Sequence, residues 1–156
     1  MKRTKAQLKA ELVAILEATL AGLERAHADA TAGATHEEAK PENDKDTRAL
    51  EQSYLARGQA MRIETLKAGL ASVTVMPLTP ADRAKPGALV EAEDDDGEPL
   101  AYFVAPEGGG TKLKGGVLVV TPLSPVGAAL IGKGEGDEVE LRVGGKARVL
   151  TILRVS

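Results

Sequence analysis

Cysteine is absent from this sequence of 156 residues, and aromatic residues make up only 2% of it. Without cysteine the chain forms neither disulfides nor thiolate metal sites, a composition typical of a reducing compartment. Two tyrosines, one phenylalanine and no tryptophan leave few aromatic faces on which nucleobases stack. The composition therefore disfavours a binding site for single-stranded nucleic acid.

The sequence also lacks an excess of basic residues and a long apolar run. Its net charge is −3, which argues against a basic surface that binds duplex nucleic acid. No apolar stretch approaches the roughly 20 residues of a transmembrane helix, and the polar residues 1–5 do not resemble a signal peptide. We therefore expect a soluble, cytoplasmic protein that does not bind membranes.

Two stretches with helical periodicity come first. Leucines recur every three or four residues between Thr4 and about Ala32, and we expect Gly33 to end this helix. Pro41 suits the first turn of a second helix, which runs to about Val73. The predicted apolar side of this helix consists of Leu50, Tyr54, Met61, Ile63, Leu66 and Leu70. Because the connection is short, the two helices are expected to pair as an antiparallel hairpin, or coiled coil.

The connection between the helices, residues 35–46, is strongly acidic. It contains five carboxylates against two lysines. Glu42 and Asp44 stand in its second half, and Glu38 lies in its first half. Such a cluster is compatible with a solvated helix start, where carboxylates complement the helix dipole, or with a surface that meets a partner.

The C-terminal half has the pattern of a small β domain. Prolines mark residues 76–86 as a linker, so residues 1–75 and 87–156 are expected to form a helical hairpin and a separate domain. Strands are expected near residues 88–93, 99–104, 116–121, 138–143 and 146–155. Between them, Ser124 and Pro125 begin a short helix that Gly132 ends. The predicted fold is α+β, with an antiparallel sheet and one small helix in the second domain.

Three motifs stand at regular distances in this half: SPVGAALIGK at residues 124–133, GDEV at residues 136–139 and GGK at residues 144–146. Together they resemble the C-terminal domain of the bacterial GreA/GreB transcription elongation factors. The resemblance implies an FKBP-like domain that docks on RNA polymerase, with Leu123, Ser124 and Pro125 in the docking loop. Family members often carry Asp or Asn where this chain has Leu123. The resemblance also implies a coiled coil that enters the secondary channel of the polymerase.

In the family, acidic residues at the tip of the coiled coil help to hold a magnesium ion in the polymerase active site and stimulate cleavage of backtracked RNA. The family pattern, roughly Gly-Asp-Leu-Ser-Glu-Asn, corresponds here to residues 38–43, so Glu42 matches and Ala39 replaces the aspartate. Glu38 and Asp44 are the nearest substitutes. The resemblance implies no catalytic group and no cofactor of the protein's own, only the magnesium of the partner polymerase. Nascent RNA and DNA would be contacted only indirectly.

Two other interpretations fit the sequence. A protein that binds the same channel and regulates or inhibits the polymerase without stimulating cleavage would account for Ala39 at the tip. A structural coiled-coil adaptor unrelated to polymerase would account for the helical hairpin alone. Retained binding without cleavage would indicate the first, and failure to bind core polymerase would indicate the second. The sequence leaves the oligomeric state and the relative orientation of the two domains open.

Overall fold

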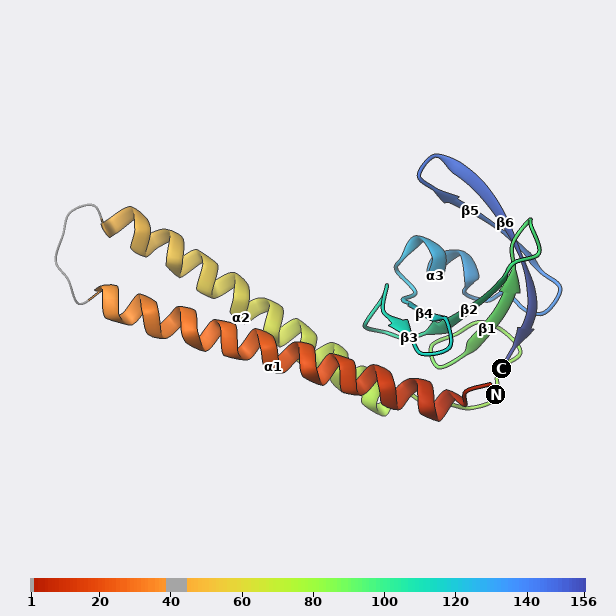
Figure 1. Cartoon of the computed structure of the whole chain (residues 1–156), viewed down its shortest axis with the longest axis horizontal. Coiled ribbons are helices and arrows are strands. Elements are labelled where there is room, and N and C mark those ends of the chain that lie inside the picture. The colour runs from red at the N-terminus through yellow and green to blue at the C-terminus, as the bar shows by residue number, and fades with distance from the viewer. Residues whose placement is uncertain (1, 39–44) are drawn as a thin grey trace. The chain divides into compact units, whose positions relative to one another are not determined.

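The computed structural model in Figure 1 describes residues 2–38 and 45–156, and for residues 33–38, 45, 46 and 143 it describes the backbone only. The helices are α1 (Lys5–Glu38), α2 (Lys45–Val75) and α3 (Pro125–Leu130). The strands are β1 (Leu89–Glu93), β2 (Pro99–Val104), β3 (Lys112–Leu113), β4 (Val117–Val120), β5 (Glu138–Val143) and β6 (Lys146–Val155). Two long helices followed by a sheet with a short helix confirm the predicted α+β class.

The chain divides into two compact units. The first consists of Met1–Ala14 and Ala71–Ser156 and contains the sheet, α3 and the start of α1. The second is Ile15–Leu70 and contains most of the two long helices. The hairpin, linker and domain boundaries drawn from the sequence pattern stay a prediction.

Helix α1 is longer than the sequence predicts. Gly33 was expected to end it, whereas the helical backbone continues through Gly33 to Glu38. A glycine inside a helix costs only about 1 kcal/mol relative to alanine, and no proline follows before Pro41. The predicted start of the second helix at Pro41 lies outside the described residues, and the described α2 runs from Lys45 to Val75.

Within the second unit, α1 and α2 lie side by side and run in opposite directions, as predicted (Figure 1). Leu16 of α1 is buried in this unit, as are Ile63 and Leu66 of α2. Farther along, Nδ1 of His27 lies 3.2 Å from Oε1 of Gln59. Buried apolar side chains and the polar contact of His27 with Gln59 therefore lie between the helices of the hairpin.

The predicted apolar side of α2 is wrong at Leu50, Tyr54 and Met61, whose side chains are 56%, 62% and 66% exposed. The partly or fully buried face of α2 is instead formed by Gln52, Ala56, Gln59, Ile63 and Leu66. These residues recur with the alternating spacing of four and three that keeps side chains on one stripe of a helix. Because Ile63 and Leu66 face α1, the large apolar residues that are out of step with them point elsewhere.

In the first unit, six strands form one sheet in the order β3-β4-β2-β1-β6-β5. The hairpins β1–β2 and β5–β6 are antiparallel, as predicted, and the pairs β1–β6 and β3–β4 are antiparallel as well. The pair β2–β4 is parallel, so the sheet is mixed, and the expectation of a purely antiparallel sheet is wrong here. The cause is β3, a strand of two residues that is too short to show an alternating pattern. It pairs with β4 as a hairpin and thereby leaves β4 parallel to β2.

The two faces of the sheet are covered by different helices. One face packs against α3 in a core that includes Val90, Tyr102, Val104, Leu130 and Ile152. On β2, Phe103 is fully buried but points to the opposite face, because neighbouring side chains of a strand alternate. That face meets the first turns of α1, where Leu8 lines a pocket together with Ala101 and Val117. The sheet is thus covered on both sides.

The segment between α2 and β1 contains neither a helix nor a named strand, but it is bound to the sheet unit. Met76 and Ala84 are buried at 4% and 2% exposure. The Ala84 N–H donates to the Lys133 carbonyl at 2.8 Å, and the Gly132 N–H donates to the Ala84 carbonyl at 2.9 Å. The segment therefore positions the end of α3 as well as connecting α2 to β1.

Candidate partner-binding loop

The loop that joins β4 to α3 is closed by hydrogen bonds to one carbonyl. The Thr121 carbonyl accepts from the Ser124 N–H at 3.1 Å and from the Ser124 Oγ at 2.7 Å. Ser124 Oγ also accepts from the Gly127 N–H at 3.1 Å, as the N-cap of α3. Pro125 follows in the first turn, where its missing N–H costs nothing. This confirms the helix start that the sequence predicts at Ser124 and Pro125.

Gly127 lets the helix approach the loop closely. A Cβ atom at this position would lie 1.7 Å from the Thr121 carbonyl oxygen, far inside contact distance. Gly127 is also buried, so a side chain has no free space to enter. The glycine is therefore required by packing of the first turn of α3 against the backbone of the loop.

Helix α3 anchors the loop to the core of the sheet unit. Leu130 is fully buried, and Val126 and Ala129 pack partly buried against the same core. The Ala128 N–H donates to the Ser124 carbonyl at 2.8 Å, so a backbone hydrogen bond of the helix also holds the end of the loop. The loop is fixed at its β4 end and at its helix end.

Leu123 projects from this fixed loop and is 96% exposed. An apolar side chain held in water gains roughly 1.5–3 kcal/mol when a partner buries it fully. Because the backbone around Leu123 is already ordered, binding would cost little additional conformational entropy. These properties suit a small contact with an apolar site on another macromolecule.

The structure brings together the three predicted docking residues, since Leu123, Ser124 and Pro125 lie in one ordered turn. Ser124 and Pro125 shape the turn, and Leu123 is the exposed side chain. Sequence reasoning missed Thr121 and Gly127, which hold the turn through a carbonyl and a missing side chain. A serine N-cap followed by proline and glycine is the pattern that points to such a close approach.

The predicted acidic tip is not placed by the structure. Glu42 and Asp44 lie outside the described residues. Glu38 is the last residue of α1, and its side chain also lies outside what is described. The role of these carboxylates therefore stays a prediction from the sequence.

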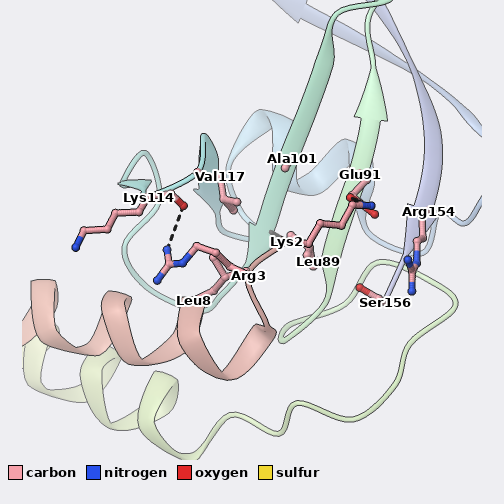
Figure 2. A pocket seen from close by; sticks show the side chains of 11 residues that line it. Lys2, Arg3, Leu8, Leu89, Glu91, Ala101, Lys114, Val117, Arg154 and Ser156 are labelled. Atoms are coloured by element: carbon pink, nitrogen blue, oxygen red, sulfur yellow. Dashed lines mark hydrogen bonds and ion pairs between the residues drawn. The ribbon is translucent and has the colours of Figure 1, made fainter.

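A pocket of about 330 Å³ lies on the sheet face opposite α3, within the first unit (Figure 2). Its apolar floor includes Leu89 and Val117, and charged side chains surround it. Lys2 Nζ lies 2.8 Å from Glu91 Oε1, and Arg3 Nη1 donates to the Lys114 carbonyl at 3.1 Å. Because Lys2 and Arg3 already have partners within the protein, we interpret the pocket as the place where the chain start meets the sheet.

Glu11 completes this contact from the first turns of α1. Its carboxylate pairs with the Arg3 guanidinium and accepts from the Lys114 N–H at 3.0 Å. Partial desolvation would raise the pKa of Glu11, but the hydrogen bonds and charges of Arg3 and Lys114 outweigh it and lower the pKa below its usual value. The ionised carboxylate therefore ties α1 to the turn between β3 and β4.

A second carboxylate organises the turn between β1 and β2. Asp94 Oδ1 accepts from the Asp96 and Glu98 N–H groups at 2.9 Å, and Asp94 Oδ2 accepts from Arg148 Nη2 at 2.9 Å. The backbone hydrogen bond from Glu98 lowers the pKa of Asp94 most, against a smaller opposing effect of desolvation. Gly97 has φ +78°, as the predicted hairpin turn requires.

Neither a metal site nor a membrane span is found in the part of the chain that the structure describes. In residues 2–38 and 45–156, no group of three or more His, Cys, Asp or Glu side chains is arranged to hold a metal ion. None of the described helices is long and apolar enough to cross a membrane.

Comparison with known proteins assigns the C-terminal half to a family. The model for the family "Transcription elongation factor, GreA/GreB, C-term" matches residues 79–156, which contain the loop and α3. "Transcription elongation factor GreA" of Brucella canis is 33% identical over 129 residues, covering 83% of this chain and 74% of that protein. The protein of the same name from Brucella melitensis biotype 1 gives the same values.

Solved structures of similar proteins include Gfh1 of Thermus thermophilus, described as GreA factor homolog 1, and Gfh1 of Thermus aquaticus. The first is 20% identical, with a TM-score of 0.42 over 92% of this chain and 94% of that chain. The second is 22% identical, with a TM-score of 0.43 over 90% of each chain. Because these TM-scores lie below 0.5, the family assignment rests on the sequence matches.

Proposed function

Because the chain belongs to the GreA/GreB family of transcription elongation factors, we propose that it binds RNA polymerase through the loop at Leu123–Pro125 and places its helical hairpin in the secondary channel. There it would stimulate cleavage of backtracked RNA. The observation that carries the proposal is a fully exposed leucine on a turn that hydrogen bonds and a buried helix hold in place.

The docking part of the proposal is supported by the chemistry of the loop. Ser124, Pro125 and Gly127 give the turn its shape without using the side chain of Leu123. Leu123 stands where relatives often carry a polar residue, so we propose an apolar site on the polymerase of this organism. The contact would depend on burial of the leucine side chain more than on charge.

The hairpin part is supported by helix length. Helix α1 has 34 residues and the described α2 has 31, and at 1.5 Å per residue they span about 51 Å and 46 Å. Only a short connection separates the two helices in the sequence, so the hairpin carries no further domain there that would prevent it from entering a narrow channel.

The tip part depends on carboxylates whose positions are known from the sequence only. Carboxylate oxygens are the ligands that magnesium prefers, and Glu42, Asp44 and Glu38 supply them near the turn. The ion would belong to the polymerase, where it activates water for RNA hydrolysis. The protein would contribute acidic side chains beside that site and would not be a catalyst on its own. It would act in the cytoplasm, where polymerase is found.

Ala39 supports a second candidate function. An alanine binds no metal, and it replaces an aspartate of the family pattern. A protein with this tip would occupy the channel and regulate the polymerase without stimulating cleavage. The two candidates share the docking loop and differ only in what the tip does.

Binding to core RNA polymerase tests the part that both candidates share. We expect Leu123→Ala to weaken binding by about tenfold, since it removes most of an apolar contact. The matched control is Leu153→Ala, because Leu153 is 45% exposed on β6, away from the loop. Equal affinities of the wild type and Leu123→Ala, or no binding of the wild type, would reject docking through this loop.

A further inference from the structure

Helix α2 has two stripes of residues with the spacing of a coiled coil. The inner stripe, which includes Ile63 and Leu66, faces α1 within the second unit. A second stripe with the same alternation of four and three residues consists of Leu50, Tyr54, Arg57, Met61, Glu64 and Ala68. Met61 stands two residues from Ile63, about 200° around the helix, so the second stripe lies on the opposite side. We call it the outer stripe.

Three of the four large exposed apolar side chains between Leu50 and Met61 lie on the outer stripe, and the fourth, Leu55, is 65% exposed beside it. Leu50, Tyr54 and Met61 are 56%, 62% and 66% exposed. At the same level, the inner stripe contains the small or polar residues Gln52, Ala56 and Gln59. Three large exposed side chains in one line on a helix are more than the scattered apolar residues of an ordinary surface.

We infer that the outer stripe is an interface with a second copy of this chain, in which two α2 helices pack antiparallel. Arg57 and Glu64 determine the direction. They stand in the same stripe, on either side of Met61 and seven residues apart. An antiparallel pair places Arg57 of each copy near Glu64 of the other, whereas a parallel pair in register places like charges together.

Both charged side chains are accessible for such contacts. Arg57 is exposed, and Glu64 is 74% exposed at the side chain. Glu64 Oε1 forms an exposed ion pair with Lys67 Nζ at 3.6 Å, and a guanidinium at hydrogen-bond distance would bind the carboxylate more strongly. The stripe is therefore complementary to itself in charge when two copies run antiparallel.

The length of the outer stripe limits the surface that a dimer buries, and therefore its affinity. From Leu50 to Ala68 it covers 18 steps of the helix, or about 27 Å. One seam of this length buries less surface than obligate dimers do, so the association is reversible and depends on concentration. The outer stripe contains no residue of the docking loop, but it lies on the hairpin that the proposed function places in the secondary channel.

Sedimentation velocity of the full chain, from low micromolar to near-millimolar concentration, tests the inference. We expect the wild type to shift from monomer to dimer over this range. Arg57→Glu and Glu64→Arg should each weaken dimerisation by about tenfold, since each replaces two attractive contacts with repulsive ones. The double variant Arg57→Glu/Glu64→Arg restores opposite charges and should dimerise as the wild type does.

Arg62→Glu is the matched control, because Arg62 is exposed on α2 but does not belong to the outer stripe. It makes the same change in net charge and should leave dimerisation unchanged, and circular dichroism should show equal helix content in all variants. A wild type that stays monomeric throughout overturns the inference. So does a dimer that tolerates both single variants, or one that the double variant fails to restore. A monomer whose polymerase binding is weakened by Arg57→Glu would assign the stripe to polymerase instead.

Discussion

Ser124 and Thr121 are joined twice, because the N–H and the Oγ of Ser124 both donate to the Thr121 carbonyl, at 3.1 Å and 2.7 Å. The same Oγ caps α3 by accepting from the Gly127 N–H. One hydroxyl thus closes the loop and starts the helix. The exposed position of Leu123 between the two residues is a consequence of this arrangement.

Replacement of Ser124 by alanine removes both hydrogen bonds of the hydroxyl. We expect Ser124→Ala to lower the free energy of unfolding by about 1 kcal/mol, the usual cost of a lost N-cap. Urea denaturation measures the change. Ser53→Ala is the control, since Ser53 is exposed within α2, where alanine is the better helix former. Equal losses in the two variants would contradict the capping role.

Gly127 and Gly22 should respond to alanine in opposite directions. An alanine Cβ at Gly127 meets the Thr121 carbonyl oxygen, and we expect a loss of about 2 kcal/mol or more in the free energy of unfolding. At Gly22, in α1, nothing lies within 4 Å of the added Cβ, and alanine should stabilise by about 0.5–1 kcal/mol. Urea denaturation of both variants tests the difference, and a stable Gly127→Ala would show that the loop is not held as described.

The contact of Glu11 with Arg3 and Lys114 should make stability depend on pH. The pKa of Glu11 is lower in the folded protein than its ordinary value of 4.5, because the two partners favour the carboxylate. The stabilisation is therefore complete above the pKa of the unfolded chain and is lost as the pH falls through the folded pKa. Thermal unfolding between neutral pH and about pH 3 measures this effect.

Glu11→Gln should reduce stability at neutral pH and weaken the dependence on pH in the acid range. Glu17→Gln is the control, because Glu17 is exposed on the same helix. A Glu11→Gln curve that runs parallel to that of the wild type would mean that the carboxylate does not act through its charge.

Much of the fold follows from local sequence patterns. The serine, proline and glycine around residues 124–132 predict α3 and its N-cap, and both are confirmed. The Asp-Gly pair predicts the turn between β1 and β2 at Gly97. Such features are predictable because the residues that determine them lie within a few positions of one another.

Contacts between distant residues were not predictable. Glu11 and Lys114 are 103 residues apart in the sequence, and no local pattern predicts the hydrogen bond between them. The parallel pairing of β2 with β4 depends on the two-residue strand β3, which has too few residues for a periodic signal.

The face of α2 was mistaken for a related reason. Leu50, Tyr54 and Met61 form a helical stripe of their own, and periodicity alone cannot tell which of two stripes meets α1. The acidic tip was predicted from the family pattern, and Glu42, Asp44 and Glu38 remain predictions.

Transcript cleavage in a backtracked elongation complex of the cognate polymerase is the most direct test of the proposed function. Wild-type protein should accelerate cleavage, Glu42→Ala and Asp44→Ala should abolish the acceleration, and Glu51→Ala, an exposed carboxylate of α2, should leave it unchanged. Binding to the polymerase without faster cleavage would contradict stimulation of cleavage and indicate a regulator that occupies the channel.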